Sequence, residues 1–222
     1  MNLNELRRLP YAAFDFDGTL ADSNGAYIDF SAACFRETGK QMPQDFVERA
    51  KAMSLTDFCA ALEKELGIWD RAEVIRRLDE FSSNFYSSRV ELKPGVREYL
   101  TQLRSEGVRM CILSATAERY IRMAVTRLDL GGFFEFIVTP DQTGGRSKSL
   151  PDIFELACHR FGDVPPGSVA MYDDSLEALR TAHAVGMAAI GVYDDASADT
   201  AEEIRTLCGG YIILDFRSLL HA

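Results

Sequence analysis

The strongest constraint on the fold is an alternation of short apolar runs and helical stretches that continues from residue 92 onward. The apolar runs are rich in residues that favour strands, and segments with helical spacing of their apolar residues separate them. Strands are expected at 11–16, 108–113, 133–138, 169–172, 188–192 and 211–214. Helices are expected at 96–106, 117–130, 151–161, 175–185 and 199–207. Because parallel strands need crossover helices, the pattern predicts an α/β fold with a doubly wound, Rossmann-like parallel sheet.

A different pattern interrupts this alternation after the first strand. Residues 24–88 read almost entirely as helix, with apolar residues recurring at spacings of three and four. The Pro94–Gly95 turn signal marks the return to alternating strands and helices. The sequence therefore predicts an all-helical cap domain, residues 21–91, inserted into an α/β core domain made of residues 1–20 and 92–222.

Charge and composition restrict the possible partners. The chain has 222 residues and a formal net charge of −10, so it repels phosphate backbones and nucleic acid is not expected as a partner. Its apolar runs are too short to span a bilayer, so no membrane partner is expected, and the N-terminus lacks the apolar stretch of a signal peptide. The five cysteines form no CxxC pair, as is typical of reduced thiols. We therefore expect a cytoplasmic protein, while the sequence leaves its oligomeric state open.

Charged and hydroxyl side chains stand where several of the expected strands end. They are Asp15 and Asp17 after the first strand, Ser114 after the second, Lys148 before the helix at 151, and Asp173 and Asp174 after the fourth. The carboxyl ends of parallel strands share one edge of a sheet, so these groups are expected to meet there. Four crowded carboxylates repel one another unless a cation such as Mg²⁺, which prefers oxygen ligands, neutralises them. We therefore predict a Mg²⁺ site in which one carboxylate of the Asp15–Asp17 segment is a nucleophile and the other an acid and base.

Four motifs, in order along the chain, resemble those of the haloacid dehalogenase-like superfamily. FDFDGTLADS is similar to the first motif, hhDxDGT, and ILSAT is similar to the second, a strand ending in Ser or Thr. Lys148, in SKSLPDIF, stands where the family has its third-motif lysine, and VAMYDDSLEALRTAHAVGM closely resembles the fourth motif and its helix. The helical insertion falls where the branch that resembles phosphoglycolate phosphatase and β-phosphoglucomutase carries its cap.

The resemblance implies phosphoryl transfer through an aspartyl-phosphate. Asp15 would attack phosphorus, and Asp17 would protonate the leaving group and then activate water. The residues expected to bind phosphate are Gly18, Thr19, Ser114, Ala115 and Lys148. The residues expected to bind Mg²⁺ are Asp15, Asp17 through its backbone carbonyl, Asp174 and, directly or through water, Asp173. The implied enzyme is a Mg²⁺-dependent phosphatase, a hydrolase of phosphoric monoesters, acting on a small phosphorylated metabolite that resembles phosphoglycolate.

The chain departs from the family pattern at several positions. Ala115 stands where Asn commonly follows the second-motif serine, which removes a side-chain contact but keeps the backbone donor. Ser149 follows the lysine where Pro is common, and Ala178 supplies no ligand at a later position of the fourth motif. In the cap, the loop beginning at Ala52 lines up with a family loop that often starts with Gly, which bears on substrate specificity.

Other functions stay open on the sequence. Asp17 favours phosphate esters, because the dehalogenase and phosphonate-cleaving relatives lack an acid at its position. A phosphomutase like β-phosphoglucomutase is an alternative, although the segment ADSNGAY lacks the histidine expected there. A phospho-acceptor receiver module would need an acceptor at the end of the third strand, where Val138–Thr139–Pro140 stands. A phosphate-binding protein that has lost turnover is the remaining alternative.

Overall fold

The computed structural model describes residues 8–51, 53 and 55–220 of the chain. The chain divides into two compact units, Met1–Ser23 with Val90–Ala222 and Asn24–Arg89, which we call the core unit and the cap unit. The cap unit begins and ends a few residues inside the predicted cap, 21–91. The reason is that residues 21–22 and 91–92 pair with each other within the core unit.

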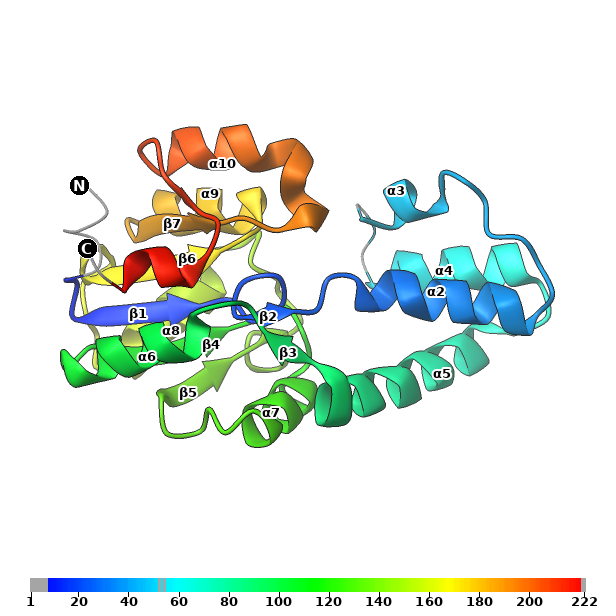
Figure 1. The fold of residues 1–222 in the computed structure, drawn as a ribbon, viewed down its shortest axis with the longest axis horizontal. Helices are drawn as coiled ribbons and strands as arrows, with labels where there is room; N and C mark the ends of the chain where they lie inside the picture. Colours follow the sequence, from blue (N-terminus) through cyan, green and yellow to red (C-terminus); the bar gives the residue numbers. More distant parts are fainter. Residues whose placement is uncertain (1–7, 52, 54, 221–222) are drawn as a thin grey trace. The chain divides into compact units, whose positions relative to one another are not determined.

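The core unit is built on a six-stranded sheet in the order β5-β4-β1-β6-β7-β8, in which each pairing of neighbouring strands is parallel (Figure 1). Its strands are β1 (Tyr11–Phe14), β4 (Arg109–Leu113), β5 (Phe134–Val138), β6 (Val169–Asp173), β7 (Ala188–Val192) and β8 (Ile212–Ile213). The first strand lies between β4 and β6, so the segments after these three strands meet at one edge of the sheet. The predicted doubly wound parallel sheet is confirmed.

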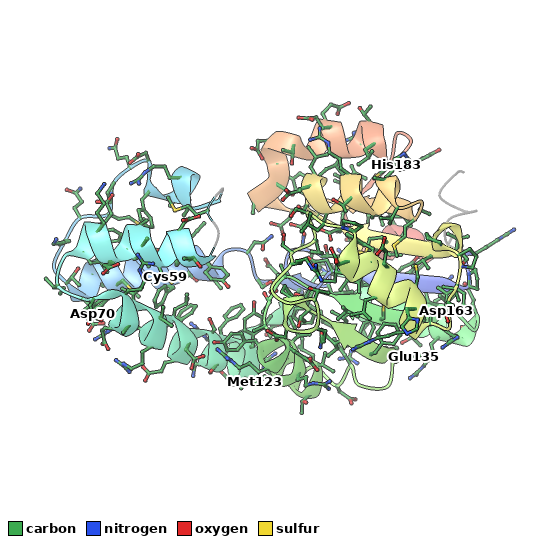
Figure 2. The ribbon with its side chains drawn as sticks, turned by 180° about the vertical axis from the view of Figure 1, so that it is seen from behind. Cys59, Asp70, Met123, Glu135, Asp163 and His183 are labelled. Atoms are coloured by element: carbon green, nitrogen blue, oxygen red, sulfur yellow. The ribbon has the colours of Figure 1, made fainter. Side chains whose placement is uncertain are left out.

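Helices cover both faces of this sheet. They are α6 (Val96–Ser105), α7 (Glu118–Arg127), α8 (Asp152–Arg160), α9 (Leu176–Ala184) and α10 (Ala201–Leu207). Figures 1 and 2, seen from opposite sides, show α6 and α8 on opposite faces. Alternation along β1 explains this, because Ala13 is buried in the cluster formed with α8, whereas Phe14 stacks on Tyr172, which contacts Tyr99 of α6. Strand β1 is therefore apolar on both faces, as is typical of parallel sheets.

A short antiparallel ribbon joins the two points where the chain leaves and re-enters the core unit. Strand β2 (Ala21–Asp22) pairs with β3 (Glu91–Leu92), with Ala21 opposite Leu92. The backbone N–H of Lys93 extends the ribbon by donating to the carbonyl of Leu20 at 2.9 Å. This ribbon follows the segment that carries Asp17, so it fixes where that segment ends.

The cap unit is helical, as its apolar spacing indicates. Its helices are α2 (Ala26–Glu37), α3 (Phe46–Lys51), α4 (Leu55–Leu66) and α5 (Arg71–Asn84), and a π-helical turn, η1, follows at Phe85–Arg89. Phe58 packs against Phe30 and Phe46 in the centre of this unit, with ring centroids 6.4 and 6.3 Å away. Ala52, at which the predicted specificity loop begins, lies outside the described residues. Among the helices of the described residues, none has the length and apolar character needed to cross a bilayer.

Gly95 is expected to be intolerant of substitution. It precedes α6 with a φ of 81°, and a Cβ there would lie 2.4 Å from the backbone nitrogen of Arg217. We expect Gly95→Ala to lower the free energy of unfolding by ~2–4 kcal/mol, because left-handed strain and a backbone clash add up. Urea unfolding measures this loss. Gly107→Ala is the matched control, since its φ is also positive (80°) but nothing lies within 4 Å of its Cβ position, so ~1 kcal/mol is expected. Equal losses in the two variants would show that the clash is relieved.

Candidate active site

The carboxyl end of β1 places Asp15 in the interior. The backbone N–H of Asp15 donates to the carbonyl of Tyr172 at 2.8 Å, which continues the pairing of β1 with β6. The chain then turns sharply, since the N–H groups of Leu20 and Ala21 both donate to the carbonyl of Phe16. Gly18 has a φ of 80°, a conformation that favours glycine. The turn leaves Asp15 buried and Asp17 partly exposed.

Lys148 joins two buried carboxylates. Its Nζ lies 2.6 Å from Oδ1 of Asp15 and 2.7 Å from Oδ2 of Asp173, and all three side chains are buried. Burial lowers the pKa of Lys148, but the charges of Asp15 and Asp173 outweigh it and raise this pKa above its ordinary value. Lys148 is therefore a fixed positive charge over the pH range in which enzymes work.

Burial is also the largest influence on the pKa values of two acids in this cluster, Asp15 and Asp174. It raises the pKa of Asp15 well above its ordinary value, and the charge of Lys148 opposes this only in part. For Asp174, burial and the neighbouring charge of Asp173 raise the pKa to about 7. The side chain of Asp174 also accepts a hydrogen bond from the hydroxyl of Thr19 at 3.2 Å. Without a bound metal ion, the ionised forms of Asp15 and Asp174 are therefore unfavourable.

The carboxylates fit a hard divalent cation. One carboxylate oxygen from each of Asp15, Asp173 and Asp174 lies within 4.8 Å of the others. Ligands of octahedral Mg²⁺, at about 2.1 Å from the ion, lie about 3–4 Å apart, so small shifts bring these oxygens into position. Each of the three acids was predicted as a ligand from the sequence. The predicted ligand of Asp17 is its backbone carbonyl rather than its carboxylate, and that assignment stays a prediction.

Two hydroxyl groups hold the carboxylate of Asp17. Ser23 donates to its Oδ1 at 2.6 Å and Thr116 donates to its Oδ2 at 2.7 Å. This carboxylate therefore has surroundings different from those of Asp15, which faces a lysine. Two carboxylates that are separated by one residue but make different hydrogen bonds can serve in two separate roles.

The second strand segment places hydroxyl and backbone groups beside Asp17. The hydroxyl oxygen of Ser114, buried after β4, accepts the N–H of Thr116 at 3.1 Å, and Ala115 between them is exposed. The structure thus brings Thr19, Lys148 and the candidate metal ligands together in one cluster, and it places Ser114 near Asp17 through Thr116. Gly18 lies in the turn between the two carboxylates. The phosphate contacts predicted for these residues stay predictions.

Sequence reasoning assigned no role to Ser23 and Thr116. Both lie inside the segments that resemble the first and second motifs, FDFDGTLADS and ILSAT. No helix or strand periodicity relates them to Asp17, because Ser23 lies across a turn and Thr116 follows a different strand. Thr116 is 99 residues away along the chain.

The pKa values of the buried acids predict how Mg²⁺ binding depends on pH. The pKa values of Asp15 and Asp174 are higher in the folded protein than in the unfolded chain, where they are about 4. The two acids therefore contribute most to the stability of the metal-free protein below about pH 4. This contribution is lost as the pH rises through their folded-state pKa values, which for Asp174 is about 7. Mg²⁺ needs the ionised acids, so its affinity rises over the same window. We expect about tenfold tighter Mg²⁺ binding at about pH 8 than at about pH 6, and a larger Mg²⁺-induced rise in the unfolding temperature. Thermal unfolding with and without Mg²⁺ tests this, and an equal rise at both pH values would contradict it.

The fold and the site define an α/β enzyme whose chemistry is carried by carboxylates and a lysine at the edge of a parallel sheet. A family model described as haloacid dehalogenase-like hydrolase matches residues 12–192, so the chain belongs to this family. The resemblance seen in the motifs, and the hydrolase class that it implies, are confirmed.

Named relatives and a solved structure are similar to the chain over most of its length. A phosphorylated carbohydrates phosphatase of Thermotoga maritima is 28% identical over 175 residues, which are 78% of this chain and 80% of that protein. A phosphoglycolate phosphatase of Chromobacterium violaceum is 28% identical over 208 residues, 89% of this chain and 90% of that protein. The crystal structure of CbbY from Rhodobacter sphaeroides, in complex with phosphate, superposes with a TM-score of 0.75 at 20% identity, covering 95% of this chain and 96% of that one. The last similarity concerns the fold alone.

Proposed function

We propose that this protein is a Mg²⁺-dependent phosphatase that hydrolyses a small phosphomonoester through an aspartyl-phosphate on Asp15. The observation that carries the proposal is the different bonding of the two acids: Lys148 contacts Asp15, and two hydroxyls contact Asp17. The names of the relatives support phosphomonoesters as substrates. Their common chemistry is a small phosphorylated metabolite, such as phosphoglycolate or a sugar phosphate.

Each step of the proposed reaction uses a group of the chain. An Oδ atom of Asp15 attacks phosphorus while the bond to the ester oxygen breaks, and Asp17 gives that oxygen a proton. Water then attacks the phosphorus of the aspartyl-phosphate, Asp17 takes the proton of that water, and phosphate leaves as Asp15 is restored. Lys148 and the hydroxyl of Ser114 hold the phosphoryl oxygens.

Asp15, Asp173 and Asp174 would hold Mg²⁺, which supplies positive charge that draws the anionic phosphate toward the nucleophile. Lys148 contacts Asp15 and Asp173 and neutralises part of their charge. The nucleophile, Asp15, and the acid and base, Asp17, are therefore different residues that lie in the same turn of the backbone.

Hydrolysis of p-nitrophenyl phosphate with Mg²⁺ and with excess chelator is the first test. We expect turnover with Mg²⁺ and loss of turnover with chelator. A panel of phosphomonoesters, with phosphate release measured for each, then identifies the substrate class. Isomerisation of a sugar phosphate without phosphate release would favour the phosphomutase alternative, and absence of turnover across the panel would favour a phosphate-binding protein.

Asp17→Asn is expected to separate the two roles of the acids. The variant keeps the nucleophile but cannot protonate a leaving group, so its activity should depend on the leaving group. We expect a loss of about 10²–10⁴-fold with alkyl phosphates and a much smaller loss in the burst of p-nitrophenol, whose departure needs no proton. Steady-state and burst kinetics measure the two effects. Equal losses with both substrates would contradict the role of Asp17 as an acid.

A further inference from the structure

A largely buried ion pair, formed by residues outside the candidate active site, lies at the same edge of the sheet. Lys93 follows β3 and Asp194 follows β7, and Nζ of Lys93 lies 2.7 Å from Oδ2 of Asp194. The same Nζ donates to the backbone carbonyl of Tyr193 at 2.8 Å. The side chains are 14% and 8% exposed, so this pair is screened by solvent far less than a surface pair.

Lys93 connects two segments of the site through different groups. Its backbone N–H donates to the carbonyl of Leu20 at 2.9 Å, which ends the turn that carries Asp17. Its side chain binds the segment after β7, as described above. The residue before Leu20 is Thr19, whose hydroxyl donates to the carboxylate of Asp174. A continuous chain of contacts therefore runs from the ion pair to a candidate metal ligand.

Asp194 fixes the other end of this connection. Its Oδ1 accepts the N–H of Ala196 at 2.9 Å and so caps the 3₁₀ turn at Asp195–Thr200. Its Oδ2 forms the ion pair with Lys93. The charges of both residues act on Asp174: that of Asp194 raises the pKa of Asp174 and that of Lys93 lowers it. The pair is therefore close to the candidate metal site as well as connected to it.

We propose that Lys93 and Asp194 are positioning residues that hold the Thr19–Ala21 segment and Asp174 in the geometry needed to bind the catalytic cation. The proposal rests on the proposed function. It concerns a residue pair 101 positions apart in the sequence, which no strand or helix pattern connects. Neither residue contacts Asp15 or Asp17 directly in the proposed reaction, so their effect should appear in cation affinity more than in the chemical step.

Positioning and simple charge effects predict different Mg²⁺ affinities for Lys93→Met and for the double variant. If only the electric field mattered, Lys93→Met would strengthen Mg²⁺ binding, Asp194→Asn would weaken it, and the double variant would resemble the wild type. If the pair positions the site, the two single variants and the double variant all weaken Mg²⁺ binding. We expect a loss of about tenfold in each, the lower end of effects measured for residues behind metal ligands.

Mg²⁺ titration calorimetry on the whole protein, combined with turnover of p-nitrophenyl phosphate, tests the proposal. We expect weaker Mg²⁺ binding in all three variants, turnover that recovers at saturating Mg²⁺, and affinity within about twofold of wild type in Lys93→Arg, which keeps the charge and donors. Arg180→Met is the matched control, because it breaks the exposed pair with Glu203 (2.6 Å) and should leave the affinity unchanged.

The outcomes separate the two proposals. Opposite shifts in the single variants, or wild-type affinity in all of them, would overturn the positioning role. Thermal unfolding identifies a variant that does not fold. If a single variant fails to fold, the double variant, which leaves neither buried charge unpaired, decides the question, because only positioning predicts that it binds Mg²⁺ more weakly than the wild type. If the wild type binds Mg²⁺ but hydrolyses no phosphomonoester, the proposed function fails, whereas the affinity comparison still decides on the pair.

Discussion

Asp15→Asn is expected to abolish turnover, with a loss on the order of 10⁴-fold or more, because a carboxamide is a poor nucleophile toward phosphorus. No phosphorylated protein should be trapped by acid quenching, whereas the wild type should carry one phosphoryl group on Asp15. The chemistry should be lost without loss of the fold. Burial makes the ionised form of Asp15 unfavourable, and Lys148 keeps Asp173 as a partner in the variant.

The free energy of unfolding of metal-free Asp15→Asn should accordingly equal or exceed that of the wild type at about pH 8, because burial disfavours the ionised form of Asp15 and the carboxamide carries no charge. Asp163→Asn is the matched control. Asp163, labelled in Figure 2, is exposed and follows α8, on the way to the opposite end of β6, so turnover should not change. Turnover like that of the wild type in Asp15→Asn would remove the nucleophile assignment.

Lys148→Met is expected to damage both stability and turnover. The substitution leaves Asp15 and Asp173 buried without the cation that contacts them at 2.6 and 2.7 Å. Removing one partner of a buried ion pair costs about 3–5 kcal/mol, so the metal-free variant should lose about that much free energy of unfolding at about pH 8. Mg²⁺ should recover part of the loss, because it supplies charge to the same carboxylates.

Arg146→Met is the control for this variant, because Arg146 lies in the same loop but is exposed and pairs with Asp152 instead. We expect its stability and turnover to stay close to those of the wild type. Urea unfolding with and without Mg²⁺, together with turnover of p-nitrophenyl phosphate, measures both effects. Equal behaviour of the two variants would show that Lys148 does not carry the charge balance of the site.

The sequence predicts the central strands well because they are buried on both faces. In the run 108–113 the apolar residues after the exposed Arg109 are uninterrupted, and the structure has β4 at Arg109–Leu113. Strand ends are less well defined: the expected first strand, 11–16, stops at Phe14 because the chain turns around the carbonyl of Phe16. The β2–β3 ribbon could not be predicted, since two residues on each side carry no periodic pattern.

The candidate site can be predicted from the sequence where charged residues stand at the carboxyl ends of predicted strands. The crowding of Asp15, Asp173 and Asp174 follows from parallel topology alone, once the strands are placed. The donors to Asp17, by contrast, follow from the details of turns, and the contact of Lys93 with Asp194 joins segments about 100 residues apart. Such contacts depend on three-dimensional packing that local patterns do not encode.

The ribbon formed by Ala21–Asp22 and Glu91–Leu92 also has a consequence for the history and engineering of the chain. Antiparallel neighbours lie about 5 Å apart, so residues 24–89 are, in topological terms, the loop of a β-hairpin. The entropy of closing such a loop rises only with the logarithm of its length, so the sheet tolerates inserts of very different size at this point. A two-residue Asn-Gly turn between Ser23 and Val90 would close the hairpin. Recombination can therefore replace the inserted domain as a unit at this point, and the strands of the core need no redesign.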